Sequence, residues 1–96
     1  MSRQEVEQII VNYLKDYDLK RIGLFGSFAR KENVPGSDID ILVKFKETPS
    51  LLLLIKLENE LSKKLGSKVD LLTEGSISNK RIKSQIKQDL RIIYNA

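Results

Sequence analysis

The chain has 96 residues, of which 41% are apolar, so it can build one domain around a modest core. Its 17 Lys and Arg outnumber its 13 Asp and Glu, and the formal net charge of +4 weakly favours contact with phosphates or with an acidic partner. The absence of Cys and His excludes disulfides, thiolate metal sites and imidazole catalysis. Any metal must therefore be held by oxygen ligands, which favour Mg²⁺, Mn²⁺ or Ca²⁺.

The N-terminal segment predicts an amphipathic helix that ends at about Asp16. Ser2 and Glu5 have the spacing of a capping box, and the apolar residues that follow recur at helical intervals. Acidic residues interrupt the apolar ones, so the segment is neither a secretory signal nor a membrane span. We therefore expect a cytoplasmic protein that makes no membrane contact.

Two strands are predicted on either side of a glycine-containing segment. The first covers residues 21–25 and is stopped by Gly26, after which residues 27–32 can form a short helix and Pro35-Gly36 a turn. The second covers residues 37–45. Its period of two places Asp38, Asp40 and Leu42 on one face.

The second half of the chain predicts a helix, a strand and a last helix. Thr48 followed by Pro49 is typical of a helix start, and this helix ends near Gly66. A third strand covers Val69–Thr73, and the last helix covers residues 78–94. The order αβ(α)βαβα predicts the α+β class, a two-layer fold in which a short mixed sheet packs with helices. We expect residues 1–96 to form a single domain.

Three aspartates have the pattern of a site for divalent cations. Asp38 and Asp40 project from the same strand face with Cα atoms about 6 to 7 Å apart, so they can converge on one cation. Asp70 is the later aspartate in a strand, and its face matches. Three carboxylates can hold two divalent ions that grip the attacking and leaving oxygens of a nucleotidyl transfer. An isolated Asp-x-Asp is more often an ordinary solvated strand end, so the argument depends on the other motifs.

Gly26 and Ser27 complement the aspartates. Glycine permits close backbone approach, and the turn that follows it can direct N–H groups and the serine hydroxyl at an anion near a helix start. A triphosphate could bridge this turn and the metal ions.

Together these motifs resemble a known signature. Gly26-Ser27, ten further residues and then Asp38-Ile39-Asp40 resemble the signature of the DNA polymerase beta-like nucleotidyltransferase superfamily, in particular its minimal single-domain members. The wording "GSFAR", "SDIDILV" and "KVDLL" is similar to the MNT proteins that are encoded beside HEPN-domain toxins. The resemblance spans nearly the whole chain.

The resemblance implies a role for each matching residue. Asp38 and Asp40 would bind Mg²⁺, with two ions in the site, and Asp70 would complete the site and help to position or deprotonate the acceptor hydroxyl. The β- and γ-phosphates of ATP would be held by the glycine and serine of the motif, while Arg30 matches its arginine. Lys31 departs from the pattern, because many relatives have glycine there.

The resemblance further implies that AMP is transferred from ATP to a tyrosine of a HEPN ribonuclease toxin, so that the protein acts as an antitoxin. The small size agrees, because a 96-residue chain leaves little room for an acceptor pocket of its own. Two alternatives remain open: a binding antitoxin that neutralises its partner by occlusion, and nucleotidyl transfer to RNA or to a small molecule. The motifs do not indicate which nucleotide base is preferred.

Three other features have both an ordinary and a functional interpretation. The apolar run at residues 51–55 cannot face one core entirely, so it is either covered by a neighbouring segment or a partner surface. A basic stripe is predicted on the last helix, either solvated or facing an acidic or RNA-bearing partner; direct DNA binding is not expected. Its members are Lys80, Lys83, Lys87 and Arg91. Tyr13, Tyr17 and Tyr94 could be modified, but we expect the first two to pack in the core.

Overall fold

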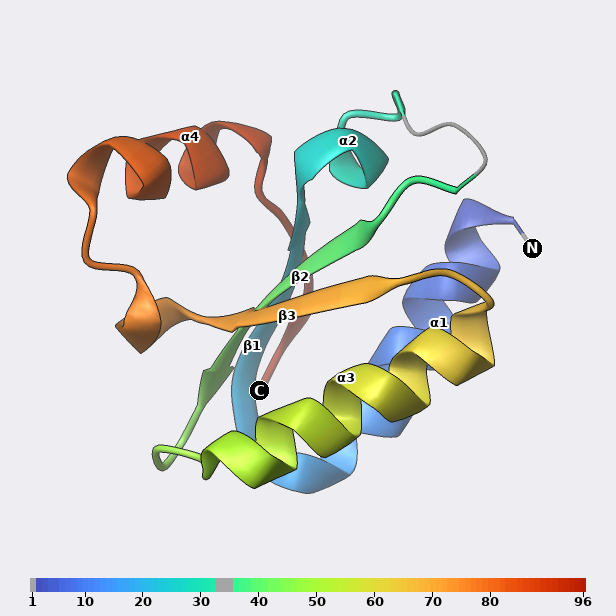
Figure 1. The fold of residues 1–96 in the computed structure, drawn as a ribbon, viewed down its shortest axis with the longest axis horizontal. Helices are drawn as coiled ribbons and strands as arrows, with labels where there is room; N and C mark the ends of the chain where they lie inside the picture. Colours follow the sequence, from blue (N-terminus) through green and yellow to red (C-terminus); the bar gives the residue numbers. More distant parts are fainter. Residues whose placement is uncertain (1, 33–35) are drawn as a thin grey trace.

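The computed structural model describes residues 2–32 and 36–96, which form a mixed sheet packed with helices (Figure 1). In these residues four strands have the order β3-β2-β1-β4, with β1 antiparallel to both neighbours and β2 parallel to β3. The elements are α1 (Arg3–Leu14), β1 (Leu19–Phe25), α2 (Gly26–Ala29), β2 (Ile39–Phe45), α3 (Leu51–Leu65), β3 (Val69–Thr73), α4 (Lys80–Asp89) and β4 (Arg91–Asn95). The predicted α+β class is confirmed.

The first half follows the sequence pattern closely. The capping box is present, since the Oγ of Ser2 accepts a hydrogen bond from the backbone N–H of Glu5 at 3.1 Å. After Leu14 the chain continues as a single 3-10 turn, Lys15–Tyr17. Strand β1 starts two residues earlier than predicted, and α2 is a shorter helix than predicted. The predicted turn at Pro35 and Gly36 lies partly outside the described residues.

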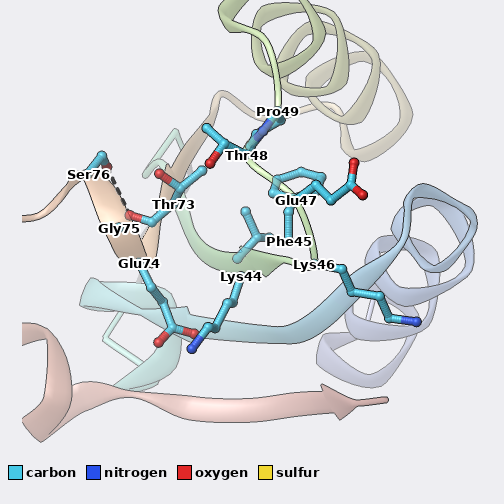
Figure 2. Close-up of a pocket in the computed structure, with 11 residues that line it drawn as sticks. Lys44, Phe45, Lys46, Glu47, Thr48, Pro49, Thr73, Glu74, Gly75 and Ser76 are labelled. Atoms are coloured by element: carbon cyan, nitrogen blue, oxygen red, sulfur yellow. Dashed lines mark hydrogen bonds between the residues drawn. The ribbon is translucent and has the colours of Figure 1, made fainter.

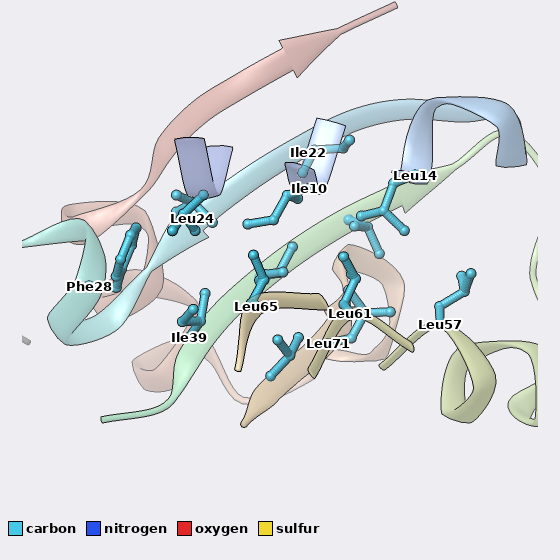
Figure 3. Close-up of a cluster of buried hydrophobic side chains, with 14 of the residues drawn as sticks. Ile10, Leu14, Ile22, Leu24, Phe28, Ile39, Leu57, Leu61, Leu65 and Leu71 are labelled. Carbon is cyan, nitrogen blue, oxygen red and sulfur yellow. The ribbon is translucent and has the colours of Figure 1, made fainter. Parts of the chain in front are cut away.

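The main core lies between one face of the sheet and the helices α1 and α3 (Figure 3). Ile10, Leu57 and Leu61 are fully buried on the helices, and Ile22 and Ile41 are fully buried on the strands. Tyr13 and Tyr17 pack against this cluster, as predicted, with ring centroids 5.8 Å apart. No helix in the described part of the chain combines the length and apolar character needed to cross a membrane.

Helix α3 starts at a different cap from the one predicted. Ser50 is the N-cap, and its Oγ accepts from the N–H of Leu53 at 3.1 Å, so the helix begins after Thr48-Pro49 rather than at them. Serine in this position satisfies an otherwise free amide, which decides the boundary. The predicted end is confirmed, because Gly66 adopts the left-handed conformation with φ 66°.

Side chains of α3 also satisfy the exposed edge of β3. The backbone N–H of Val69 donates to the Oγ of Ser62 at 3.0 Å, and that of Leu71 donates to Oε2 of Glu58 at 2.9 Å. These two amides point away from β2, so without these acceptors the edge would be unpaired. The helix thereby fixes the strand that carries Asp70.

The prediction of one long last helix is wrong. Helix α4 ends at Asp89, Leu90 is extended, and Arg91–Asn95 forms strand β4 against β1. The physical reason is that β1 would otherwise be an open edge, and the β-branched and aromatic residues at 92–94 suit a strand. Arg91 consequently leaves the predicted basic stripe; its Nε donates to Oε1 of Glu7 at 3.0 Å.

The apolar run at residues 51–55 divides as its helical spacing predicts. Leu53 and Leu54 pack against the core, whereas Leu51 and Leu52 are 72% and 80% exposed. No described segment covers those two residues, so the interpretation as a partner surface stays a prediction.

Candidate active site

The sheet face opposite the main core is arranged in bands. Directly paired residues of neighbouring strands point to the same face. The first row contains Phe25, Asp40 and Asp70, because Phe25 pairs with Asp40 and Asp40 pairs with Asp70. The next row consists of Gly23, Leu42 and Leu72, and beyond it Arg21 pairs with Lys44. An acidic band is thus separated from a basic band by an apolar one.

The acidic band brings together residues that lie thirty positions apart in the chain. Asp40 and Asp70 are register partners on the parallel strands β2 and β3, which agrees with the prediction that the two side chains share a face. The pKa of Asp40 is raised to about 6, first by burial and then by the negative charges of Asp70 and Asp38, while the positive charge of Arg30 opposes this rise. The three carboxylates therefore influence one another through their charges.

Gly26 places the glycine-serine turn directly against Asp40. Its φ is 74°, in the left-handed region, and a Cβ at this position would lie 2.2 Å from Oδ2 of Asp40. Only glycine permits both this conformation and this approach. The two halves of the sequence motif are therefore in contact, although Asp40 follows Gly26 by fourteen positions in the chain.

Helix α2 presents its first turn toward the same place. No side chain caps its N-terminus, whereas α1, α3 and α4 are capped by Ser2, Ser50 and Asn79. The uncapped amides and the hydroxyl of Ser27 are the kind of donors that bind phosphate.

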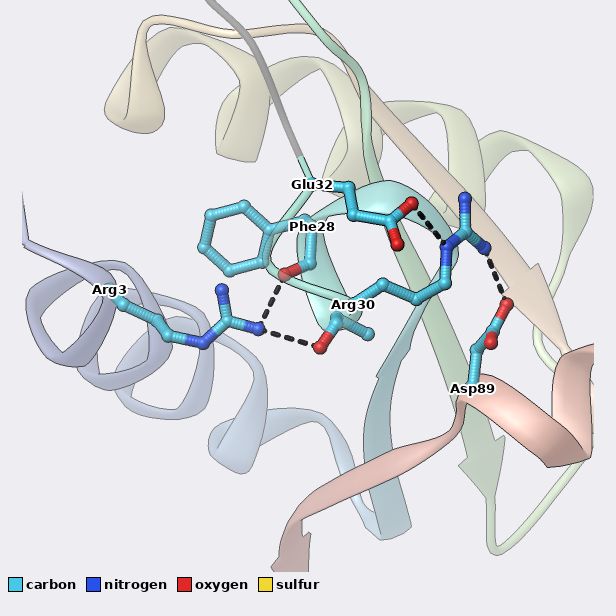
Figure 4. A network of polar contacts seen from close by, with 6 residues as sticks. Arg3, Phe28, Arg30, Glu32 and Asp89 are labelled. Carbon is cyan, nitrogen blue, oxygen red and sulfur yellow. Dashed lines mark hydrogen bonds and ion pairs between the residues drawn. The ribbon is translucent and has the colours of Figure 1, made fainter.

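Arg3 supports the other end of α2, which sequence reasoning missed. Its guanidinium lies 4.6 Å from the ring centroid of Phe28 and donates to the carbonyl oxygens of Phe28 and Ala29, the latter at 3.0 Å (Figure 4). A cation at the C-terminus of a helix is favourable because it satisfies free carbonyls there. In the sequence, Arg3 is noticeable only because it lies inside the Ser2–Glu5 capping box. That motif does not indicate which group the Arg3 side chain contacts.

Arg30, which the resemblance places among the cofactor-binding residues, forms ion pairs with two carboxylates. Its Nη1 donates to Oδ2 of Asp89 at 2.6 Å and its Nε to Oε2 of Glu32 at 3.1 Å (Figure 4). These bonds raise the pKa of Arg30, with Asp89 contributing most. The residue thus links α2 to the end of α4, and its role toward a nucleotide stays a prediction.

Lys31 has a backbone conformation that suits glycine. Its φ is 62°, in the left-handed region that costs a residue with a Cβ about 1–2 kcal/mol. This explains in physical terms why a glycine at this position would be accommodated more easily than the lysine of this chain.

The donor set fits a hard divalent cation. The side chains of Asp38, Asp40 and Asp70 offer only oxygen atoms, and burial together with the charges of Asp70 and Asp38 raises the pKa of Asp40. In the described residues no three acidic side chains are already clustered closely enough to enclose an ion. The pairing of Asp40 with Asp70 is therefore observed, while the convergence of all three carboxylates on metal stays a prediction.

Two pockets differ in their relation to this site. One of about 390 Å³ is lined by residues 43–49 and 73–76, at the far ends of β2 and β3, and lies away from the aspartates (Figure 2). Another of about 250 Å³ lies between α4 and the sheet and includes Phe25 and Leu72, the neighbours of the acidic band.

The chain is similar to a known protein family over most of its length. Residues 7–93 match the family model described as the nucleotidyltransferase domain. The chain belongs to this family. As a nucleotidyltransferase it is an enzyme, which confirms the resemblance drawn from the motifs.

Two relatives of this nucleotidyltransferase have names that state an activity. A Methanocaldococcus jannaschii protein is 48% identical over 90 residues, covering 90% of this chain and 92% of its own, and carries the provisional name of protein adenylyltransferase. The protein adenylyltransferase MntA of Thermococcus cleftensis is 37% identical over 92 residues, covering 92% and 93% of the two chains.

Two solved structures share the fold of this nucleotidyltransferase. A toxin-antitoxin structure with AMP-PNP has a TM-score of 0.85 at 29% identity, covering 94% of this chain and 73% of that one. The tri-AMPylated HEPN toxin of Shewanella oneidensis in complex with its MNT antitoxin has a TM-score of 0.82 at 28% identity, covering 99% and 74%.

Proposed function

We propose that this nucleotidyltransferase transfers AMP from ATP to a tyrosine hydroxyl of a cognate HEPN-domain toxin in the cytoplasm, and so acts as an antitoxin. The observation that carries the proposal is the contact between the Gly26 backbone and the carboxylate of Asp40, which is itself in register with Asp70. A triphosphate bound along this line would meet amide donors at one end and carboxylates at the other. The names of the relatives and the AMP-PNP structure support ATP as donor.

The residues divide the work between the two ends of the nucleotide. Gly26 and Ser27 hold the β- and γ-phosphates through the free amides at the start of α2 and the serine hydroxyl. Asp70, on the edge strand, positions the acceptor hydroxyl and takes its proton as the acceptor oxygen bonds to the α-phosphorus. The bond between the α-phosphorus and the bridging oxygen breaks, and pyrophosphate leaves.

Asp38, Asp40 and Asp70 would hold Mg²⁺, which supplies Lewis-acid polarisation of the α-phosphate and neutralises charge on the leaving pyrophosphate. The burial and crowding of Asp40 favour occupancy by a cation, because ionising this carboxyl in the empty site is costly.

The acceptor is proposed to reach the site on a separate protein. The pocket at the acidic band measures only about 250 Å³, which is small for binding both a nucleoside and a protein segment. The HEPN toxin in the Shewanella complex is AMPylated, and that observation supports a HEPN toxin as the acceptor protein.

One experiment tests donor, acceptor and stoichiometry together. The purified protein is incubated with Mg²⁺, each labelled nucleoside triphosphate and the product of the adjacent gene, and intact masses are measured. We expect the partner to gain mass in steps of one AMP, with ATP and only when Mg²⁺ is present. Label on RNA or on a small molecule instead of protein would overturn the assignment of the acceptor.

A non-catalytic antitoxin is the second candidate, because the three carboxylates are not already clustered around a metal position. Asp40→Asn separates the two. If transfer and toxin control are lost together, neutralisation requires the enzyme; if the variant still neutralises fully, occlusion is sufficient.

A further inference from the structure

The pocket between α4 and the sheet has a lining that packing alone does not explain. Ile82, Gln85, Ile86 and Asp89 of α4 line it, together with Phe25 and Leu72 of the sheet. The four helix residues have the spacing i, i+3, i+4 and i+7 of a single stripe, which in a helix that only covers a sheet would be apolar. Here two of the four are polar, and only Ile86 is buried.

The apolar walls of this pocket remain open to solvent. Leu72 and Ile82, which contribute its sheet side and its helix side, are 38% and 49% exposed. A pocket of about 250 Å³ that is lined by large apolar side chains is suited to a flat ligand.

Gln85 gives the pocket hydrogen-bonding capacity. Its side-chain amide makes no hydrogen bond with another described residue, and it lies one turn before Asp89 on the same helix face. Asp89 is fixed by its 2.6 Å bond to Arg30, which anchors this end of α4 beside α2 (Figure 4). The amide is thus presented on an anchored helix.

The pocket adjoins the acidic band. Leu72 follows Asp70 by two residues on the same strand face, so their Cα atoms lie about 6 to 7 Å apart. Phe25 directly precedes Gly26, which begins the turn proposed to bind the phosphates. A nucleotide whose α-phosphate lies at the aspartates therefore needs to span only its ribose to place its base in the pocket.

We propose that this pocket binds the nucleobase of the donor and that Gln85 selects adenine over guanine. A glutamine amide can pair with both N6 and N7 of adenine, donating one hydrogen bond and accepting the other, whereas guanine presents two acceptors at that edge. The aromatic ring of an acceptor tyrosine is the competing occupant. It fits less well, because its only polar group, the hydroxyl, must reach the α-phosphate and leaves Gln85 unused.

This inference rests on the proposed function, and its test uses nucleotide binding without any acceptor. ATP and GTP are each titrated calorimetrically into the full chain with Mg²⁺, for the native protein, Gln85→Arg and Gln88→Arg. Arginine pairs bidentately with O6 and N7 of guanine. Gln88 is an exposed glutamine of the same helix outside the pocket, so it controls for the added charge.

We expect the native protein to prefer ATP, and Gln85→Arg to move the ratio of the two Kd values toward GTP by at least about tenfold, as expected for one bidentate pair. Gln88→Arg should leave the ratio unchanged. A native protein without preference, or an unchanged ratio in Gln85→Arg, overturns the assignment while AMP transfer to the partner still upholds the proposed function.

Transfer assays with the partner resolve the remaining outcomes. If Gln85→Arg raises the KM for the protein acceptor and leaves both nucleotide affinities intact, the pocket belongs to the acceptor and the inference is wrong. If the native protein neither binds a nucleoside triphosphate nor transfers one, the proposed function fails and the inference fails with it.

Discussion

The two faces of the sheet differ in what their side chains do. On the side of α1 and α3, fully buried apolar residues such as Ile22 and Ile41 alternate along the strands. On the opposite side the same strands carry Asp40, Asp70 and the exposed Leu72, partly covered by α4. The buried face stabilises the fold. The opposite face can therefore carry crowded carboxylates and an exposed leucine, which do not stabilise the fold. Mutation of one residue on a strand should therefore change activity, whereas mutation of its neighbour should change stability.

The largest expected effect is on the open face. Asp70→Asn should lower the rate of AMP transfer on the order of 10³-fold, because a carboxylate that binds cations and accepts the proton is lost, which removes several kcal/mol of transition-state stabilisation. The thermal midpoint should not fall, because Asp70 lies on the open face. Single-turnover transfer and a melting curve measure the two. Near-native transfer would remove Asp70 from the mechanism.

Leu71→Ala tests the adjacent residue on the core face. Leu71 is 7% exposed within the main core, so truncation should lower the free energy of unfolding by about 2–5 kcal/mol. Transfer per folded molecule should change far less than in the Asp70 variant. Urea unfolding followed by circular dichroism gives the loss, and an unchanged midpoint would contradict the assignment of this face to the core.

Glu58→Ala tests whether α3 holds the edge strand. Removing the acceptor of the Leu71 N–H should destabilise the fold by about 1–3 kcal/mol, because a buried donor is left unpaired. Glu60→Ala on the same helix is the control, since no hydrogen bond of its side chain to a described residue is seen. Equal losses of stability in the two variants would show that the hydrogen bond from the Leu71 N–H to Glu58 does not stabilise the fold.

Gly26→Ala and Gly66→Ala form a matched pair. Both glycines have a positive φ, of 74° and 66°, so each substitution should cost about 1–2 kcal/mol of stability. Only the alanine at position 26 would collide with the Asp40 carboxylate, since nothing lies within 4 Å of a Cβ at position 66. We expect transfer to be lost in the first and kept in the second. Similar activities of the two variants would show that the close approach of Gly26 to Asp40 is not required for transfer.

The smallest effect concerns pH. Because the pKa of Asp40 is raised to about 6 in the fold, the folded state binds this proton more tightly than the unfolded chain does. The contribution of this group to stability is therefore present below about pH 4 and is lost as pH rises through 6. In buffer with a chelator, Asp40→Asn should exceed the native protein by about 1 kcal/mol or less at pH 7.5, after allowance for solvent screening, and match it near pH 4. If the difference in stability between Asp40→Asn and the native protein did not change with pH, the raised pKa of Asp40 would not be its cause.

The candidate site could be predicted because its motifs are local. Gly26-Ser27 directly follows a strand, Asp38 directly precedes the next strand, and Asp40 and Asp70 lie within neighbouring strands. Period two assigns Asp40 and Asp70 to a strand face without knowledge of the partner strand. The register that pairs Asp40 with Asp70 had to come from the structure.

The last segment could not be assigned in this way. Ile82, Ile86 and Leu90 continue a helical spacing into a stretch that also suits a strand, and local pattern cannot decide between them. The open edge of β1 decides it, because β4 satisfies backbone groups that a longer helix would leave unpaired. The same contact ends α4 at Asp89, next to Arg30.

The sequence by itself therefore determined the strand faces, the helix caps at Ser2 and Gly66, and the residue types able to hold a cation and a triphosphate. Only the tertiary structure decided which strands pair, which side chain contacts the end of α2, and which residues of α4, Gln85 among them, line a pocket. The division follows from range: face and cap preferences are set within a few residues, whereas pairing and pocket formation depend on groups that only the folded chain brings together.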